Sequence, residues 1–498
     1  MSALVVLPVL VPLVGAALSI LGGRSRTFQR VVGLTVLTTQ VVFAVLLLVE
    51  VDRDGPVSMQ AGGWEAPMGI TFVADRFSAI MLVVASVMLL AVLVYAIGQP
   101  GAERNHVGFQ SVYLVMAAGV SAAFLTGDLF NLFVSIEMML TASYVLITLG
   151  GRLDQVRSGM TYVVISLLAS VLFISLLAFV YASTGTMNLA DLAGKIAELP
   201  PGLRSALAVL MIVVFGIKAA IFPLFFWLPD AYPTAPSPVT AIFAGLLTKV
   251  GVYAMIRTQT LLFPEDTRPG TLLLWVAALT MVVGVLGAIA QGDVKRILSF
   301  NIVSHIGYMV MGLGLFTVAG LAGAVFYTVH HIVSKTALFL AGGLIEHAGG
   351  SSRLTRLGDM VRSTPVIAVL FFLPAMSLIG MPPFSGFVAK FALVDATAAS
   401  GSYAVMATAL VVSLLTMYSL SKIWISAFWS PATEPLEEAV VLPERGRLGG
   451  PVLMVVPTAI LIAITVAMGV AAGPLYDLSQ RAAVDLLDPA AYLTAVAP

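Results

Sequence analysis

Two lysines stand in apolar runs on either side of a proline-rich stretch, between Gly216 and Gly251. Lys218 precedes the prolines and Lys249 follows them. The prolines are Pro223, Pro229, Pro233, Pro236 and Pro238. Proline lacks a backbone donor and clashes with the preceding turn, so a helix must break or kink here. Because a broken helix in lipid must face protein or a watery cavity, amines beside it predict a path for ions.

An acidic residue in another apolar run is the expected partner of the first lysine. Glu137 lies about midway along the run, where an isolated carboxylate in hydrocarbon would be costly. We therefore expect it to face the bundle interior and to pair with Lys218, two spans later. A carboxylate favours the charged lysine and burial favours the neutral one, so small movements could switch the proton. A purely structural ion pair is the alternative.

Three later residues extend this series of ionisable groups. Lys249 lies deep in its run and could receive a proton from Lys218, although a lysine snorkelling to the interface is the alternative. His331 and Lys335 are four residues apart and therefore share a helix face. A neutral histidine is a suitable shuttle between lysines.

Lys390 follows a second proline cluster, formed by Pro374, Pro382 and Pro383, and is the candidate terminal site of the path. Asp395, five residues later, either modulates Lys390 or only marks a helix end. Lys422 lies beside an aromatic cluster, and for this residue we expect snorkelling to the interface.

Two further histidines are possible accessory groups. His330 either assists its neighbour or only bonds an adjacent helix, and His305 is either accessory or a packing residue. Adjacent histidines point in different directions and no third ligand is evident, so we predict no metal site.

The composition indicates an all-α polytopic membrane protein. The chain has 498 residues, of which 59% are hydrophobic and 10% are charged, and its mean hydropathy is +1.04. Soluble domains carry about 25% charged residues. With 25 basic and 25 acidic residues, nothing suggests nucleic-acid binding. The absence of cysteine excludes disulfides and iron–sulfur ligation, and no cofactor motif is present, so we expect no cofactor.

About 14 apolar segments are long enough to span a bilayer, which takes about 20 residues. We read the first as a retained span because it lacks a basic leader. A turn or hairpin is expected in 51–69 and a short interfacial helix in 187–199, and 430–450 is an acidic loop. The spans are near 2–22, 30–50, 70–98, 109–126, 128–150, 158–183, 204–228, 234–258, 270–290, 296–316, 318–346, 364–394, 401–429 and 451–473.

Basic residues alternate between the loops and predict the orientation. Cytoplasmic loops carry an excess of lysine and arginine, whereas the opposite loops offer little beyond Arg53, Lys195 and Arg268. This bias predicts both termini on the outer side. The basic loops hold Arg24, Arg26 and Arg30; Arg104; Arg152 and Arg157; Lys295 and Arg296; Arg353, Arg356 and Arg362; and Arg445 and Arg447.

Matching polar features suggest two inverted five-helix repeats, about spans 4–8 and 9–13, each with a proline-broken helix. Lys218 and Lys390 are 390 − 218 = 172 residues apart, and Glu137 and Ser304 are 304 − 137 = 167 apart. An odd number of spans inverts the second unit, which is typical of transporters. The predicted parts are 1–108 with helices 1–3, 109–258 and 259–430 with the repeats, and 431–498 with an acidic loop and a C-terminal helix.

The chain resembles the antiporter-like subunits shared by Mrp-type multisubunit sodium/proton antiporters and the membrane arm of respiratory complex I. The resemblance rests on Glu137 in span 5, Lys218 in broken span 7, Lys249 in span 8 and the HxxxKxxLFL pattern from His331. The segments TGDLFNLFVSIEMMLTASYVLI and AYPTAPSPVTAIFAGLLTKVGVYAMIR are most similar to the D subunits of Mrp antiporters.

Some positions distinguish members of this family. Lysine rather than glutamate at 390 argues against the complex I subunit with an acidic terminal site. Ser135 and Ile136 replace bulkier residues, and His305 stands where glutamine is frequent.

The resemblance implies a transporter subunit rather than an enzyme. Its proton relay would run through Glu137, Lys218, Lys249, His331 with Lys335, and Lys390, and sister subunits, including a larger homologous one, would couple proton movement to sodium efflux across the plasma membrane. The alternative is a proton-pumping subunit of a complex I-like oxidoreductase or related hydrogenase. A solitary solute transporter and a scaffold with a vestigial relay fit the lysine series less well.

Overall fold

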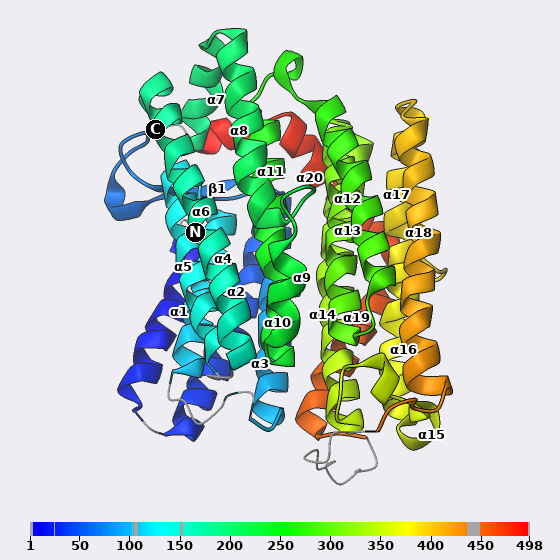
Figure 1. Ribbon diagram of the computed structural model, residues 1–498. Coiled ribbons are helices and arrows are strands. Elements are labelled where there is room, and N and C mark those ends of the chain that lie inside the picture. Colours follow the sequence, from blue (N-terminus) through cyan, green and yellow to red (C-terminus); the bar gives the residue numbers. More distant parts are fainter. Residues whose placement is uncertain are drawn as a thin grey trace.

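The computed structural model describes residues 3–23, 25–101, 103, 108–149, 153–435 and 449–496. Its helices run roughly along one long axis (Figure 1). Their bounds are α1 Ala3–Leu21, α2 Arg26–Asp54, α3 Arg76–Gly98, α4 Phe109–Leu125, α5 Leu129–Thr148, α6 Leu153–Thr184, α7 Leu189–Glu198, α8 Pro201–Ala219, α9 Trp227–Ala231, α10 Ser237–Ile242, α11 Thr248–Leu261, α12 Gly270–Ala290, α13 Val294–Gly314, α14 Val318–Gly349, α15 Met360–Ser363, α16 Pro365–Ile379, α17 Ser385–Ala399, α18 Tyr403–Trp424, α19 Val452–Val470, α20 Ala472–Leu487 and α21 Ala490–Val496.

The helices confirm the predicted polytopic fold. Twelve helices in the described ranges are long and apolar enough to cross a membrane, counting α10 to α11 as one continuous helix. Two shorter apolar helices, α4 and α16, lie where spans 4 and 12 were predicted. Helix starts follow their caps: Asp128 accepts a hydrogen bond from Asn131 N and begins α5, and Asp293 accepts one from Arg296 N and begins α13.

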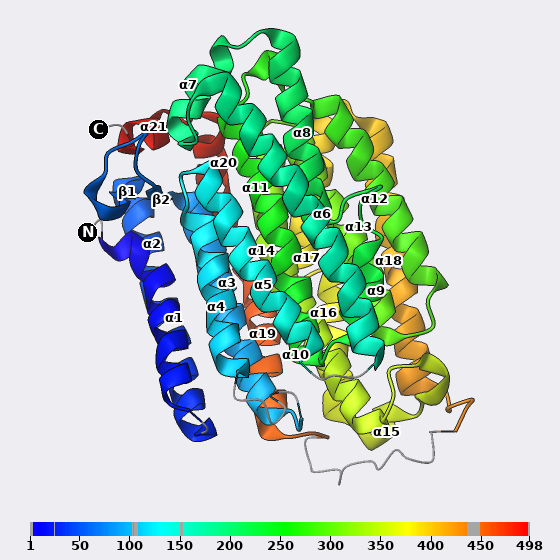
Figure 2. The same cartoon turned by 60° about the vertical axis from the view of Figure 1, so that its left-hand side comes forward.

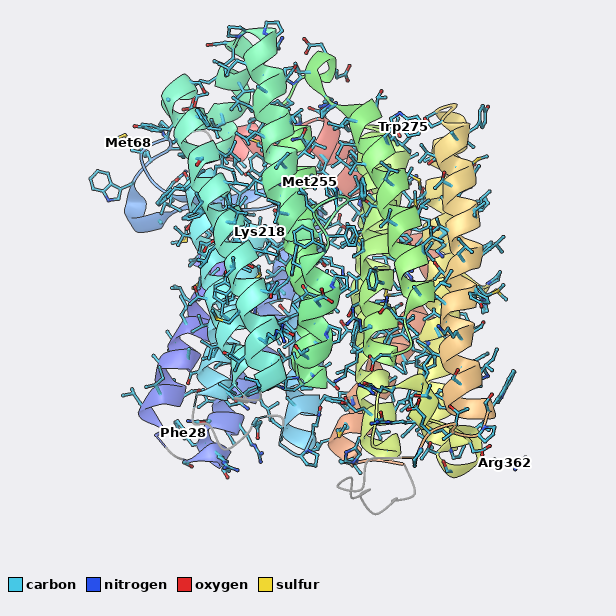
Figure 3. The ribbon with its side chains drawn as sticks, viewed as in Figure 1. Phe28, Met68, Lys218, Met255, Trp275 and Arg362 are labelled. Carbon is cyan, nitrogen blue, oxygen red and sulfur yellow. The ribbon has the colours of Figure 1, made fainter. Side chains whose placement is uncertain are left out.

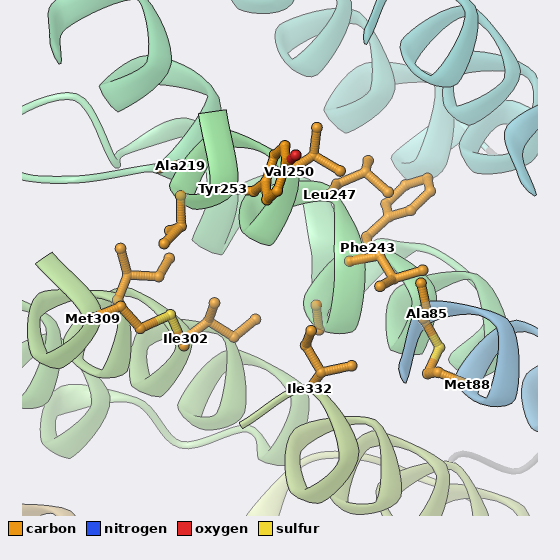
Figure 4. Packing of buried hydrophobic residues seen from close by; sticks show 14 of the residues in the cluster. Ala85, Met88, Ala219, Phe243, Leu247, Val250, Tyr253, Ile302, Met309 and Ile332 are labelled. Atoms are coloured by element: carbon orange, nitrogen blue, oxygen red, sulfur yellow. The ribbon is translucent and has the colours of Figure 1, made fainter. Parts of the chain in front are cut away.

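The most polar spans lie at the centre of the bundle. Within their most apolar windows, α14 and the α10–α11 helix are 100% buried and α13 is 94% buried, whereas α1, α2 and α6 reach 33–39%. The helices α14 and α13 are also the least apolar of the twelve. A helix surrounded by protein can carry polar side chains that a lipid-facing helix cannot. Figure 4 shows this central core, where residues of α3, α11, α13 and α14 pack together.

Both predicted helix breaks are present. α8 ends at Ala219, its C-cap Ala220 has a left-handed φ of 61°, and the chain becomes helical again at α9. α16 ends at Ile379, its C-cap Gly380 has φ 93°, and α17 follows after the proline pair. Side chains bond the carbonyls freed at the breaks, since Trp227 Nε1 donates to Ile217 O and Lys390 Nζ donates to Ile379 O.

Backbone contacts relate two halves of the molecule. Leu129 N donates to Met187 O, and Val294 N donates to Ser352 O, at an offset of 294 − 129 = 165 residues. The first contact adjoins α7 and the second adjoins α15, and these helices lie at opposite ends of the bundle (Figure 1). The second unit is therefore inverted, while the limits 109–258 and 259–430 stay predictions.

The offset of 172 residues between Lys218 and Lys390 is not the repeat offset. Lys218 precedes its break, at the end of α8, whereas Lys390 follows its break, inside α17. The left-handed residues Ala220 and Gly380 are 380 − 220 = 160 residues apart. The two lysines therefore occupy different positions in their repeats.

The predicted hairpin and the predicted short helix are also present. Strands β1 Val57–Gln60 and β2 Thr71–Ala74 pair antiparallel, with Val57 opposite Ala74, and α7 covers most of 187–199. After α19 the structure adds α20 and α21, which a search for long apolar spans passes over because they are shorter and more polar. Residues 436–448 of the acidic loop lie outside the described residues.

In Figure 2, α1 begins at about half the height of the molecule and α21 lies near α7 and α20, both away from α15. Phe28, in the region of Arg26 and Arg30, and Arg362 mark the α15 end (Figure 3). Several of the basic residues used to predict orientation lie outside the described residues, namely Arg24, Arg104, Arg152, Arg445 and Arg447.

Candidate functional site

Glu137 of α5 and Lys218 of α8 form the expected pair. Lys218 Nζ lies 3.7 Å from Glu137 Oε1, and Ser170 of α6 donates a hydrogen bond to the same oxygen. Lys218 Nζ also donates to Ser170 Oγ and Ser166 O, both at 3.2 Å. The serine hydroxyl therefore bridges the carboxylate and the amine.

The pair lies at about half the height of the bundle, where Lys218 is labelled (Figure 3). Lys218 occupies the last turn of α8, two residues before the left-handed Ala220. α11 packs closely on this turn, because a Cβ on Gly251 would lie 2.6 Å from Ala219 N. The break in α8 and the small size of Gly251 thus allow the backbone of Lys218 to contact α11 two residues after Lys249.

Lys249 is fully buried beside a π-helical turn, Phe243–Leu247. Its amine donates to Ala244 O and, at 3.2 Å, to Thr248 Oγ1. A π turn disturbs the regular backbone bonding of the helix and often occurs at functional sites. No ion pair to Lys249 is recorded within the described residues, so a proton held here would be compensated by dipoles alone.

His331 and Lys335 lie on α14, fully buried. Neither ring nitrogen of His331 and no atom of the Lys335 amine has a hydrogen-bond partner among the described residues. The His331 ring lies 5.3 Å from the ring of His305, on α13. Buried polar groups are generally hydrogen-bonded to protein or to water. The His331 ring and the Lys335 amine, in the middle of the bundle, are therefore free to hydrogen bond water.

Two tyrosine rings, those of Tyr327 and Tyr308, connect His305 with Lys390. His305 Nδ1 hydrogen bonds Tyr327 Oη, and the Tyr327 ring stacks on Tyr308 at 5.2 Å. Lys390 Nζ lies 5.3 Å from the centroid of the Tyr308 ring. His305 is thus placed between α14 and Lys390, rather than packed apart from them.

Lys390 is held at the second break. Its amine donates to Ile379 O at 2.8 Å and to Ser413 Oγ at 2.9 Å. His330 contacts the same region, since its Nδ1 hydrogen bonds Ser385 Oγ at 2.8 Å, at the start of α17. Of the two interpretations of His330, the structure shows the bond to an adjacent helix.

The structure also shows where two other residues named from the sequence lie. Asp395 is exposed while Lys390 is buried, because five residues along a helix turn a side chain to a different face. Lys422 is partly buried, and its amine donates to Ile289 O and Gln291 O at 3.1 and 2.7 Å, at the end of α12. The unbonded carbonyls of a helix end attract this amine.

The sequence reasoning missed several polar groups that the structure brings together. They are Ser166 and Ser170 beside the ion pair, Tyr308 and Tyr327 beside His305, the buried pair Asp75–Arg257, and the pair Lys295–Glu346. Helical spacing in apolar runs was the available signal, since Ser166 and Ser170 are four residues apart. No group of three or more His, Cys, Asp or Glu side chains suited to a metal occurs within the described ranges.

Comparison with known proteins identifies the family. Residues 126–416 match the family described as NADH:quinone oxidoreductase/Mrp antiporter, TM, and this range contains every predicted relay residue. The chain is 44% identical to the D subunit of the Na(+)/H(+) antiporter of Alkalihalophilus pseudofirmus over 500 residues, covering 100% of this chain and 99% of that protein.

Solved structures give the same result. A chain of the Mrp complex from Dietzia sp. DQ12-45-1b superposes with a TM-score of 0.91 and 36% identity, covering 100% of both chains. A chain of the membrane-bound sulfane sulfur reductase, an archaeal respiratory membrane complex, superposes with a TM-score of 0.89 and 25% identity, again over 100% of both. On the family match and the full-length relatives, this chain belongs to the NADH:quinone oxidoreductase/Mrp antiporter transmembrane family.

Proposed function

We propose that this chain is the D-type component of a multisubunit sodium/proton antiporter and that it moves protons. The observation that carries the proposal is the Glu137–Lys218 pair, bridged by Ser170 at a helix break. Its full-length relative in Alkalihalophilus pseudofirmus is named as the D subunit of an Na(+)/H(+) antiporter.

The relay connects Glu137 and Lys218 with Lys249, then with His331 and Lys335, and then with Lys390. The amine of Lys218 has two sets of partners, the Glu137–Ser170 pair and the carbonyl of Ser166. A small displacement toward Ser166 weakens attraction to the carboxylate and releases a proton toward Lys249. Water joins the unpartnered groups of α14, and His305 with Tyr327 and Tyr308 extends the path toward Lys390.

A sister subunit covers the α5 face of this chain. The Glu137 side chain is 25% exposed, and exposed residues before and after it on α5 include Phe130, Val134 and Val145. A partly exposed carboxylate at mid-membrane depth is too costly to leave against lipid. Other membrane subunits of the antiporter, including a larger homologous one, are the expected partners, and sodium efflux is coupled to proton movement through them.

The orientation follows from the charges. Basic residues in the loops at the α15 end support a cytoplasmic location for that end, and we expect both termini on the outer side of the plasma membrane.

The test is transport by the intact complex in membrane vesicles from cells that lack other sodium/proton antiporters. Sodium-dependent proton flux without any electron donor is the expected result, and it should disappear when this chain is deleted. Proton movement that requires an electron donor would instead favour the alternative, a subunit of a respiratory oxidoreductase. The superposition on a chain of a respiratory membrane complex is the observation behind this alternative.

A further inference from the structure

A polar cavity opens between the two repeats at the end of the bundle that carries the basic loops. Its volume is about 750 Å³. Its lining includes Gln155, Asp230, Ser237, Lys295, Arg296 and Glu346. The charged side chains come from both halves of the chain, so the cavity belongs to neither repeat alone. None of these residues is part of the relay described above.

The ion pairs of the cavity differ in depth. Arg296 and Asp230 are 3.0 Å apart, with side chains 44% and 64% exposed, and lie at its outer rim. Lys295 Nζ and Glu346 Oε2 are 2.6 Å apart, with side chains 7% and 39% exposed. The inner pair therefore connects an almost fully buried amine with a carboxylate that water still reaches.

Glu346 also contacts the helix that leads to Lys249. Ser237 Oγ, in the first turn of α10, donates to Glu346 Oε2 at 3.2 Å. Lys295 Nζ donates to Ala235 O, just before α10, at 3.5 Å. The carboxylate is thus placed where α10, α13 and α14 meet.

A line of polar groups follows the contact between α10 and α14 inward. A Cβ on Gly343 would lie 2.5 Å from Tyr95 Oη and 2.6 Å from Ser237 Cβ, so the missing side chain keeps this contact open. Tyr95 Oη itself donates to Leu340 O at 3.0 Å. Further in, a Cβ on Gly245 would lie 2.5 Å from Thr336 Oγ1.

This line ends at the relay. Gly245 is the neighbour of Ala244, whose carbonyl accepts the hydrogen bond from Lys249, and Thr336 is the neighbour of Lys335. The polar groups are therefore continuous in position from the cavity to the two central lysines, although the side chains alone do not form an unbroken chain of hydrogen bonds.

We propose that this cavity is the aqueous entrance of the proton path and that Glu346 is its first protein acceptor. A proton from cavity water joins the Glu346 carboxylate and neutralises it. This weakens its attraction to Lys295, whose amine keeps Ala235 O as an acceptor. The neutral acid then passes the proton, through Ser237, Tyr95 and intervening water, toward Lys249 and Lys335. The proposal rests on the proposed function, because it supplies protons to the same relay.

The first experiment replaces Glu346→Gln in the intact complex. Glutamine keeps the shape but cannot accept a proton in this way, so we expect sodium-dependent proton flux to fall by at least about tenfold, with partial recovery in Glu346→Asp. Glu434→Gln is the matched control, because Glu434 pairs with Arg356 at 3.6 Å outside the cavity lining. Unchanged flux in a well-assembled Glu346→Gln complex would refute the assignment.

The second experiment tests the route without changing a charge. Gly343→Ala places a methyl against Tyr95 and Ser237, and we expect it to slow proton flux by about tenfold. Gly342→Ala is its neighbour and control, because that Cβ would meet its nearest atoms at 3.6 Å, an ordinary contact. Equal flux in the two variants would contradict the route.

The third experiment uses the absence of native cysteine in this chain. Ser158→Cys, at a partly exposed position of the cavity lining, should react with a charged, membrane-impermeant maleimide added from the side of the basic loops, whereas the buried Ser86→Cys of α3 should not. No labelling of Ser158→Cys, or labelling only from the opposite side, would overturn the aqueous entrance.

The two proposals fail separately. If Lys218→Ala leaves antiport intact, the relay itself is wrong. If Lys218→Ala abolishes antiport while Glu346→Gln and Gly343→Ala do not affect it, the relay stands and only the entrance is wrong.

Discussion

Lys218 is the residue on which the proposed relay most depends. Its amine is the link between Glu137 and the break in α8. We expect Lys218→Ala to lower sodium-dependent proton flux by roughly a hundredfold or more. A side chain that transfers a proton typically contributes at least about this factor to the rate. The measurement is flux in vesicles that contain equal amounts of assembled complex.

Lys422→Ala is the control for this substitution. It also removes a lysine from an apolar run, but that amine only bonds carbonyls at the end of α12. Normal flux in a well-assembled Lys218→Ala complex, or equal loss in both variants, would contradict the role of Lys218.

Ser170 allows a second test of the Glu137–Lys218 pair, because its hydroxyl contacts both charged groups. Ser170→Ala removes the bridge but leaves the carboxylate and the amine, so we expect flux to fall by about tenfold rather than to disappear. Ser175→Ala on the same helix is the control, because Ser175 Oγ donates to Val171 O within α6. A Ser170→Ala complex as active as Ser175→Ala would show that the bridge is not needed.

At the scale of elements, the breaks in α8 and α16 use different residues for the same left-handed turn. Gly380 adopts φ 93° and Ala220 adopts φ 61°. A Cβ on Gly380 would also lie 2.9 Å from Lys390 Cδ. We expect Gly380→Ala to destabilise the protein by about 1–3 kcal/mol and to displace Lys390, which thermal unfolding and flux measurements can detect.

The reverse substitution is informative. Ala220→Gly relieves the left-handed alanine and should leave thermal stability equal or slightly higher. A Gly380→Ala protein as stable and active as Ala220→Gly would show that the second break does not need glycine.

At the scale of the whole molecule, a buried ion pair joins distant parts of the chain. Arg257 Nη1 of α11 lies 2.6 Å from Asp75 Oδ2, and the guanidinium lies 5.2 Å from the ring of Tyr492 in α21. Burial alone would raise the pKa of the Asp75 carboxyl, but the Arg257 guanidinium and the hydrogen bonds from Ser78 hold that pKa below its usual range. The pair therefore attaches the C-terminal helices to the core.

Removing one partner leaves the other buried and unpaired. We expect Asp75→Asn to destabilise the protein by about 3–5 kcal/mol, measured by thermal unfolding at neutral pH. Because the folded pKa is lowered, the stabilisation is present above the unfolded pKa, about 3.9, and is lost as the pH falls through the folded value. The difference in melting temperature between the two proteins should thus narrow below about pH 4. A difference that is absent at neutral pH would contradict this role.

Much of the architecture could be read from the sequence because it depends on local chemistry. Apolar runs of bilayer length gave the spans, prolines gave the breaks after Lys218 and before Lys390, and the helical spacing of His331 and Lys335 placed both on one face. The pairing of Glu137 with Lys218 was also predicted, because two charges in lipid must find each other.

The sequence by itself thus determined the class of protein, its membrane spans and the ionisable groups placed within them, since burial of a charge in an apolar run is visible without coordinates. Only the tertiary structure decided which groups meet. Ser170, Tyr327 and Glu346 come from helices distant in sequence, and their contacts depend on how those helices pack. The exposure of Asp395 and the contacts of Lys422 also depend on this packing, because neighbouring helices and freed carbonyls, not composition, determine where each side chain lies.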